Sequence, residues 1–230
     1  MERLGGGRNY KYYDLILGGF VCVLLCSNLI GASKIASVWG VQFSSGVLFF
    51  PISYIFGDVL TEVYGYAHSR KVVWAGFGAM AFASLMSAFV VNIPPAEGWP
   101  HQAAYEAVFG GTYRIFLGSL IAFFCGEFAN SYTLAKMKIW SNGKRLWIRT
   151  IGSTVVGEAV DTLIFYPIAF LGLWPLETVF TVLFHNYLMK VGVEVVMTPV
   201  TYRIVAFLKR AENEDYYDRD THFTPFSLKT

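Results

Sequence analysis

The sequence predicts an all-α membrane protein, a polytopic bundle of six transmembrane helices. Of the 230 residues, 55% are hydrophobic and only 15% are charged, which is too apolar for a soluble domain of this length. The hydrophobic residues fall into six runs, each able to supply the ~20 helical residues that cross a bilayer. The alternating apolar and polar residues of membrane β-barrel strands are absent from the sequence, so helices remain as the way to satisfy the backbone in lipid.

The six predicted spans are separated by residues that favour turns and helix ends. Gly40 lies in the first gap, Pro94 in the third and Pro175 in the fifth. Only the third gap is long, and its polar, amphipathic stretch His101–Val108 is expected to lie on the outer surface. The spans are, in order, Leu15–Ala32, Ser45–Tyr64, Val72–Ile93, Ile115–Lys136, Thr150–Leu173 and Thr178–Leu208.

The basic residues predict the orientation of these spans. Arg3, Arg8 and Lys11 precede the first run as in a signal peptide, but five further apolar runs follow it, so we expect a retained first span. Fourteen of the 18 Lys and Arg residues lie before the first span, in the second and fourth loops or in the tail. Because basic loops stay in the cytoplasm, both termini are predicted to be cytoplasmic.

These features predict three parts of the chain. Residues 1–14 form a cytoplasmic N-terminal segment, residues 15–208 a six-helix transmembrane domain, and residues 209–230 a polar cytoplasmic tail. From Ala211 onward the tail is polar and acidic, a composition that predicts mobility.

Composition and motifs argue against several functions. The net charge is only +2 and the basic residues are scattered, so no nucleic-acid partner is expected. Cys22, Cys26 and Cys125 lie inside apolar runs without metal or disulfide spacing. The four histidines lack metal-ligand spacing, and no nucleophile motif such as GxSxG is present in the sequence. We therefore expect no metal, no other cofactor and no catalytic residue.

Six carboxylates inside the predicted spans are the most informative feature of the sequence. On insertion scales one central Asp or Glu costs ~2.5–3.5 kcal/mol, so six would cost on the order of 15–20 kcal/mol before pairing and snorkelling recover part of it. A cost of this size calls for an explanation, either structural pairing or function. The six residues are Asp58, Glu62, Glu127, Glu158, Asp161 and Glu194.

Structural pairing is the simpler explanation for two of these acids. Glu62 lies near the end of its span, where Arg70 and Lys71 could reach it. Lys190 and Glu194 are one helical turn apart and could neutralise each other on one face of the sixth span.

The mid-span acids Glu127, Glu158 and Asp161 are harder to explain by pairing. Within the membrane they have at most Lys190 as a counter-ion. They must therefore be protonated, be solvated in a polar cavity, or await a substrate that donates hydrogen bonds or carries positive charge. Glu158 and Asp161 share one helix face, as do Glu127 and Asn130, which predicts a shared cavity.

Glycine precedes three of the acids, in the pairs Gly57–Asp58, Gly126–Glu127 and Gly157–Glu158. Small residues let helices approach closely, so the glycines indicate packing. The segments 57–61 and 157–161 lie on the second and fifth spans, which run in opposite directions. They suggest an inverted repeat of three plus three spans with a site at the midplane.

Aromatic residues close in sequence to the acidic turns have two readings. Most are expected to be packing residues, although a flat ring bound between them could stack there. They are Phe49, Phe50, Tyr54, Tyr132, Phe165 and Tyr166.

Several stretches together resemble one known family. The longest is Phe50–Gly65, with the sequence FPISYIFGDVLTEVYG. The others are Glu127–Ser131, Arg149–Thr154 with Gly157–Glu158 and Asp161–Thr162, Asn186–Lys190, Tyr217–Asp218 and Thr221–Phe226, in which Thr224 stands where Asn is more often expected. These stretches resemble the queuosine precursor transporter family, also described as a vitamin uptake transporter family, over nearly the whole chain.

The resemblance implies uptake of 7-deazaguanine compounds, the cyano or aminomethyl precursors of the modified tRNA base queuosine, without a known cofactor. A guanine-like edge offers two adjacent N–H donors that one carboxylate can accept, while Asn or Lys can donate to the carbonyl side. We hypothesise that Glu158 and Asp161 face the donor edge of the cargo and that Asn130, Asn186 and Lys190 face its acceptor side. Glu127 would be a second anchor or a proton carrier. Gating or coupling is assigned to Asp58, Glu62 and Glu194.

Other readings of the sequence stay open. The chain could be the vitamin- or nucleobase-binding membrane subunit of an ATP-driven uptake complex, although its small-residue motif Ala32–Ala36 is predicted on the outer side, away from an ATPase. An intramembrane enzyme would need a nucleophile or metal cluster, which the sequence does not display. The expected partners are lipid and a small deazapurine substrate. A second copy of the chain is also possible, because small-residue helix faces would allow a homodimer.

Overall fold

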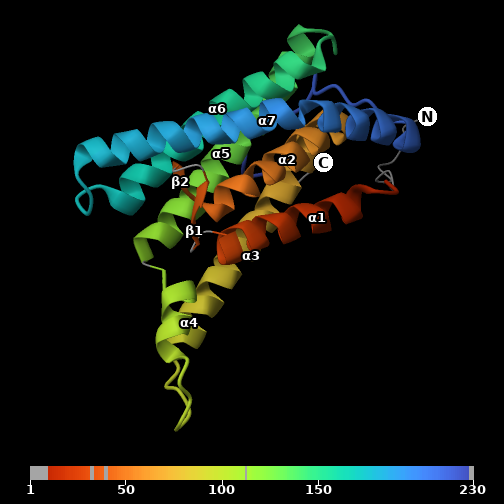
Figure 1. Cartoon of the computed structure of the whole chain (residues 1–230). Coiled ribbons are helices and arrows are strands. Elements are labelled where there is room, and N and C mark those ends of the chain that lie inside the picture. Colours follow the sequence, from red (N-terminus) through yellow and green to blue (C-terminus); the bar gives the residue numbers. More distant parts are fainter. Residues whose placement is uncertain (1–9, 32–33, 39–40, 112, 228–230) are drawn as a thin grey trace.

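The fold is a bundle of six long apolar helices, as predicted. The computed structural model describes residues 10–31, 34–38, 41–111 and 113–227; of the predicted N-terminal segment, residues 1–9 lie outside this part. Each of the six spans contains a helix long and apolar enough to cross a membrane (Figure 1). The elements are α1 (Tyr13–Cys26), the π-helix η1 (Ser27–Gly31), β1 (Ile35–Val38), β2 (Val41–Ser44), the 3₁₀-helix η2 (Ser45–Leu48), α2 (Phe50–Tyr64), α3 (Tyr66–Asn92), α4 (Gln102–Phe109), α5 (Tyr113–Trp140), α6 (Leu146–Phe170) and α7 (Leu176–Glu212).

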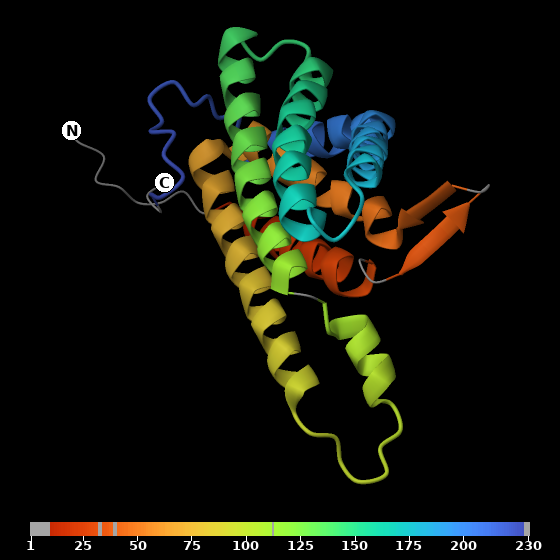
Figure 2. The same ribbon diagram turned by 90° about the vertical axis from the view of Figure 1, so that its left-hand side faces the viewer.

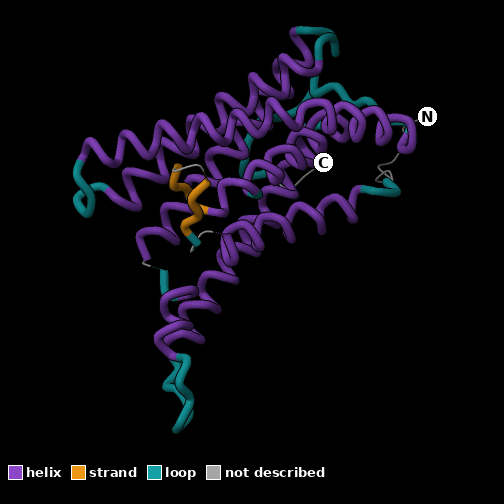
Figure 3. The backbone as a smooth tube through the Cα atoms, in the orientation of Figure 1, coloured by secondary structure: helices purple, strands orange, loops and turns teal. Residues whose placement is uncertain are grey.

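A small β-hairpin in the first loop was not predicted. Strands β1 and β2 pair antiparallel, with Ile35 opposite Ser44 and Val38 opposite Val41 (Figure 3). The hairpin connects the first span to η2, which continues directly toward α2. At 1.5 Å per residue α2 alone is about 22 Å long and shorter than the ~30 Å hydrocarbon core. Helix η2 therefore completes the second span.

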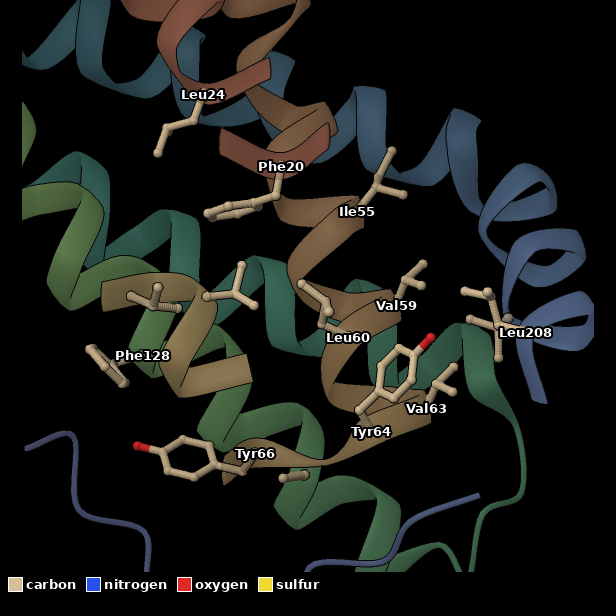
Figure 4. Close-up of a cluster of buried hydrophobic side chains, with 14 of the residues drawn as sticks. Phe20, Leu24, Ile55, Val59, Leu60, Val63, Tyr64, Tyr66, Phe128 and Leu208 are labelled. Atoms are coloured by element: carbon tan, nitrogen blue, oxygen red, sulfur yellow. The ribbon is translucent and has the colours of Figure 1, made fainter. Parts of the chain in front are cut away.

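Helix α2 lies at the centre of the bundle and is buried along nearly its whole length. Its apolar side chains pack against α1, α5 and α7, and a cluster of buried residues joins the four helices (Figure 4). Phe20 and Leu24 come from α1, Phe128 from α5 and Leu208 from α7. Because neighbouring helices enclose α2, polar side chains on this helix face protein instead of lipid.

Helices α2 and α3 are separated by one residue, Gly65, whose φ of +86° suits glycine. The expected loop between these spans is therefore absent, and α3 begins at Tyr66, six residues before the predicted start at Val72. Arg70, which precedes the predicted start of the third span at Val72, belongs to the first turns of α3 and is buried.

The far end of α3 and the short helix α4 project together from the rest of the bundle (Figure 2). Pro94 and Pro95 follow the last turn of α3, and α4 then runs back toward α5. The predicted amphipathic stretch His101–Val108 thus forms a helix, with boundaries shifted by one residue. None of its described residues is buried.

Helices α5 and α6 pack side by side through two glycines (Figure 2). A Cβ atom on Gly157 would lie 2.7 Å from Asn130 Cβ and 3.0 Å from the Gly126 carbonyl oxygen. A Cβ atom on Gly126 would lie 2.6 Å from the Tyr54 hydroxyl oxygen. Real Cβ contacts are longer than this, so the glycines allow the close approach that the sequence predicted. The approach places the acids that follow these glycines next to α2.

The prediction of a mobile tail was wrong for its described residues. Asp218 accepts the Tyr66 N–H with both carboxylate oxygens at 3.1 Å, and Arg70 donates to the carbonyl of Thr224 at 2.7 Å. The Trp74 indole donates to the Pro225 carbonyl at 2.7 Å. The acidic composition predicts mobility, but carbonyl and carboxylate groups of the tail accept hydrogen bonds from residues of α3.

The tail, the start of the chain and two helix junctions meet at one end of the molecule, which we call the basic end. Glu212 accepts hydrogen bonds from the backbone N–H groups of Lys11 and Tyr12, at 2.9 and 2.7 Å. The Tyr64 hydroxyl also donates to Glu212, at 3.0 Å. The α5–α6 turn joins the same end through Lys138, which donates to the Tyr216 carbonyl at 2.7 Å.

Candidate functional site

Five carboxylates form a buried group near the middle of their helices, which we call the acid cluster. Asp58 on α2 is enclosed by α5, α6 and α7, and each acid in the group is at most 5% exposed. The acids are close enough to interact electrostatically. Glu194 and Glu127 act on Asp58, and Glu158 and Asp161 act on Glu127. The members are Asp58, Glu127, Glu158, Asp161 and Glu194.

Lys190 on α7 lies between two of these acids. Its Nζ is 2.8 Å from Glu158 Oε2 and 2.6 Å from Asp161 Oδ2, and it also lies 4.6 Å from the centre of the Phe50 ring. Glu158 and Asp161 therefore share one face of α6, as their i, i+3 spacing predicted. Among the described residues, Lys190 is the one cation that forms an ion pair with the acid cluster.

The alternative in which Lys190 and Glu194 neutralise each other is wrong. The ammonium group pairs across the helix interface with α6, while neither carboxylate oxygen of Glu194 has a hydrogen-bond partner among the described residues. The two side chains are one turn apart on α7, but two carboxylates on the neighbouring helix attract Lys190 more strongly than one on its own helix.

Asn130, which was predicted on the acceptor side of the cargo, contacts Asp58 on α2. Its Nδ2 donates to Asp58 Oδ1 at 2.8 Å, and the Ser153 hydroxyl reaches the same oxygen at 3.4 Å. Asn186 donates to the Val182 carbonyl one turn earlier in α7, at 2.9 Å. The predicted acceptor-side group of Asn130, Asn186 and Lys190 is thus divided among different partners in this conformation.

Several polar side chains in and beside the acid cluster have buried atoms without hydrogen-bond partners among the described residues. Both oxygens of Glu127, both of Glu194 and the hydroxyl of Tyr54 lack a partner among the described residues. Buried polar groups are normally satisfied, and leaving one unpaired costs ~1–3 kcal/mol. These groups therefore indicate a ligand, a proton or a second conformation.

The sequence predicts only a packing or stacking role for Tyr54. It is fully buried on α2, and the charges of Glu158, Asp161, Glu127 and Asp58 all act on its hydroxyl group. Its position four residues before Asp58 places both on one helix face, a signal that could have identified it. Phe50 lies one turn before Tyr54 in α2, and the centres of the two rings are 5.9 Å apart.

The other aromatics divide between lipid, the tail and the site. Phe49 is exposed on the bundle surface, and Tyr132 packs edge-on against Phe223 of the tail at 5.3 Å. Phe165 packs against Tyr166 at 5.2 Å. Of these, Tyr166 is buried and close enough to Lys190 for their charges to interact, so it lies at the edge of the acid cluster.

Glu62 belongs to a separate group, the basic-end cluster, together with Lys138, Arg149, Lys209 and Asp215. Its Oε1 lies 2.8 Å from Arg149, 2.6 Å from Lys209 and 3.6 Å from Lys138. These three cations take the place expected for Arg70, which donates to tail carbonyls. The predicted functional pair of Asp58 and Glu62 is therefore split between two environments.

Asp215 extends the basic-end cluster into the tail. Its Oδ1 lies 2.6 Å from Lys138 Nζ and 2.8 Å from Lys209 Nζ. Partial burial alone would raise the pKa of Asp215, but hydrogen bonds from the two lysines outweigh it and hold the pKa below its usual range. At Asp218 burial dominates and raises the pKa, against the Thr221 hydroxyl and the Tyr66 N–H.

Two cavities lie away from the acid cluster. One of about 260 Å³ is bounded by α1, η1, α3, α4 and α5, and includes Asn28, Ser84 and Ser119. Another, of about 440 Å³, is an open apolar groove beside Phe56 and Phe207. In the described part of the chain, no group of three or more His, Cys, Asp or Glu side chains is arranged to hold a metal ion.

Comparison with known proteins identifies the family. Residues 44–204 match the family described as putative vitamin uptake transporters. The chain belongs to this family. The matched region contains the whole acid cluster and three members of the basic-end cluster, Glu62, Lys138 and Arg149. The vitamin uptake transporter family is a family of transporters, so the chain is a multi-pass membrane transporter and not an enzyme.

Curated relatives of this transporter share one kind of name. It is 33% identical over 185 residues to a probable queuosine precursor transporter of Bacillus subtilis, with 80% of each chain covered. It is 24% identical to the queuosine precursor transporter of Escherichia coli, with 58% of each chain covered, and 23% identical to a probable one of Haemophilus influenzae, with 54% of this chain and 51% of the relative covered. No solved structure matches this transporter significantly.

Proposed function

We propose that this transporter imports queuosine precursors, 7-cyano-7-deazaguanine or 7-aminomethyl-7-deazaguanine, into the cytoplasm. The observation that carries the proposal is the acid pair Glu158 and Asp161, buried at mid-helix and served by one cation, in a chain whose curated relatives are named for these cargos. A charged group inside the membrane is expensive and marks a substrate or ion pathway.

The chemistry of the pair suits a guanine-like edge. One carboxylate can accept two adjacent N–H donors, and hydrogen bonds to an ionised acceptor are worth about 1.5–3 kcal/mol each. Glu158 Oε1 has no hydrogen-bond partner among the described residues and is free to accept. Lys190 donates on the opposite side, toward the cargo carbonyl, after loosening from one of its two acids.

Aromatic side chains complete the proposed cargo site. Phe50 and Tyr54 from α2 and Tyr166 from α6 border the acids and Lys190. A flat deazapurine ring stacks favourably on such side chains. The conformation described encloses the acids, so we propose that the helices separate to admit the cargo.

The basic-end cluster is assigned a different role. Glu62 and Asp215 join α2, α5, α6, α7 and the tail through Lys138, Arg149 and Lys209. The basic residues favour the cytoplasm for this end, so we propose that both termini and the polar tail from residue 209 are cytoplasmic. The cluster would then close the cargo site from the cytoplasmic side.

The proposal is tested in bacteria that cannot make the precursor and are supplied with it externally. Expression of this transporter is expected to restore queuosine in tRNA, measured by mass spectrometry of digested tRNA. If queuosine stays absent while folded protein is present in the membrane, the cargo assignment is wrong. Uptake of labelled precursor by the purified chain in liposomes without ATP would exclude the ATP-driven subunit.

The site is tested by Glu158→Gln and Asp161→Asn. Each substitution removes an anionic acceptor and keeps the side-chain shape, so uptake is expected to fall at least tenfold, about 1.4 kcal/mol. Glu106→Gln, on the exposed face of α4, is the control and should transport as wild type. Wild-type uptake in both site variants would contradict the site.

A further inference from the structure

The acid cluster holds more acids than its cation can neutralise. Five buried carboxylates have one ion-pair partner, Lys190, within the described part of the chain. An unpaired ion in the protein interior costs several kcal/mol even after relaxation. Some of the acids must therefore be neutral carboxylic acids that carry protons.

Glu127 and Glu194 are the two acids of the cluster least able to carry a charge, and Glu127 lies against the backbone of α2. It is fully buried, and neither of its oxygens has a hydrogen-bond donor among the described residues. Asp58 receives the Asn130 amide, and Glu158 and Asp161 have Lys190. An ionised Glu127 would have neither kind of support.

The groups around Glu127 come from three helices. Most are acids, which disfavour a further negative charge. The unpartnered hydroxyl of the fully buried Tyr54 lies beside Gly126, the residue before Glu127. The facing groups are Tyr54 and Asp58 from α2, Glu158 and Asp161 from α6, and Glu194 from α7; the ammonium group of Lys190 is bound to Glu158 and Asp161.

The carboxyl group of Glu127 also rests directly on the backbone of α2. A Cβ atom on Gly57 would lie 2.7 Å from Glu127 Oε2. The glycine therefore provides the space that this carboxyl group occupies. Helix α2 carries Phe50, Tyr54 and Asp58 and borders the proposed cargo site. A change in the charge of Glu127 therefore acts directly on this helix.

We propose that Glu127 binds a proton that moves together with the cargo, so that the protein is a proton-coupled symporter. This inference rests on the proposed function. A hydronium ion at the side of higher proton activity transfers a proton to a Glu127 oxygen, which forms the O–H bond of the neutral acid and leaves water. At the other side that bond breaks, the proton passes to a water molecule to form hydronium, and Glu127 is left as the carboxylate.

Cargo and proton favour each other's binding through the acids. A cargo that donates N–H groups to Glu158 stabilises the ionised form of Glu158. That negative charge acts on Glu127 and favours its protonated form. By reciprocity, a protonated Glu127 raises the affinity for cargo by the same factor. Cargo therefore enters with its proton.

The test uses the full chain in liposomes with uncharged 7-cyano-7-deazaguanine. Wild-type protein is expected to accumulate cargo when the outside is acidic, and a protonophore should abolish the accumulation. Glu127→Gln mimics the protonated acid. Its gradient-driven accumulation, expressed relative to its own cargo exchange at equal pH, should fall at least tenfold.

Gly57→Ala gives a second variant that removes no titratable group. Its methyl group displaces the Glu127 carboxyl group, so accumulation per unit of pH gradient should fall several-fold. Gly78→Ala, where a Cβ meets no atom within 4 Å, is the matched control and should match wild type. If Glu127→Gln does not fold, unchanged coupling in Gly57→Ala overturns the proposal.

The outcomes distinguish failure of the proton inference from failure of the cargo assignment. Wild-type exchange that ignores the pH gradient overturns the proton inference and leaves the cargo assignment standing. Gradient-driven accumulation that persists in Glu127→Gln also overturns it. No exchange and no accumulation by folded wild-type protein overturns both.

Discussion

The two buried polar groups of this transporter differ in how their charges are balanced. The basic-end cluster has three cations for two carboxylates, and Glu62 contacts all three. The acid cluster has one cation for five carboxylates among the described residues. Both lie among the same helices, so the difference lies in the side chains and not in the scaffold.

This difference separates a structural role from a transport role. A buried ion that is fully paired joins the elements that supply its partners, and breaking the pair leaves a costly charge. A buried acid without a partner stabilises little and remains available to a ligand or a proton. Variants of the two clusters should therefore affect stability and transport in opposite proportions.

The largest loss of stability is expected for Glu62→Gln. The substitution leaves the buried guanidinium of Arg149 without its carboxylate partner, which costs about 3–5 kcal/mol. Thermal unfolding in detergent, followed by size-exclusion chromatography, measures the loss, with Glu106→Gln as control. Unfolding at the wild-type temperature would contradict a structural role for the basic-end cluster.

A smaller loss is expected in the tail, for Phe223→Ala. The Phe223 ring packs against Tyr66 at 5.1 Å and lies 3.9 Å from Lys136 Nζ, so its removal should cost about 1–3 kcal/mol. Phe226 is 75% exposed, and Phe226→Ala should be neutral. Limited proteolysis of the tail distinguishes the two; equal cleavage rates would show that the ring contacts do not hold the tail.

Glu158→Gln should reverse this pattern. Lys190 keeps Asp161 as a partner at 2.6 Å, so stability should fall by only about 1 kcal/mol or less, while cargo uptake falls at least tenfold. Melting temperature and liposome uptake are measured on the same preparation. A loss of stability as large as that of Glu62→Gln would erase the distinction between the clusters.

The smallest effect is expected for Asp215→Asn. Its side chain is 46% exposed, so solvent screening limits the cost to about 0.5 kcal/mol at neutral pH. Because the pKa of Asp215 is lowered in the folded state, its stabilisation is present above the unfolded value of ~3.9 and disappears as pH falls through the folded pKa. Asp218, whose pKa is raised, acts in the opposite direction and is the same in both proteins.

Comparing melting temperatures of wild type and Asp215→Asn between pH 7 and pH 3 therefore isolates Asp215. The two proteins should converge in acid. A difference that stays constant down to pH 3 would show that the lysines do not stabilise the ionised form.

Hydrophobic runs and charge spacing predicted the six spans and the shared face of Glu158 and Asp161 because these are local properties of a helix. The partners of Glu62 were not predictable in this way. Arg149 is 87 residues away and Lys209 is 147 residues away, whereas Arg70 is near in sequence. The tail was misjudged for the same reason, since composition does not show which distant donors will meet its carbonyls. The inverted repeat and the homodimer stay predictions.

The docked tail has a consequence for how the protein is made. Residues 215–225 are synthesised after all six helices, yet they supply hydrogen bonds to Tyr66, Arg70 and Trp74 at the start of α3. While earlier helices enter the bilayer, these donors must be satisfied by water or by other segments. The basic end of the nascent chain therefore reaches its final form only after the last helix has left the ribosome.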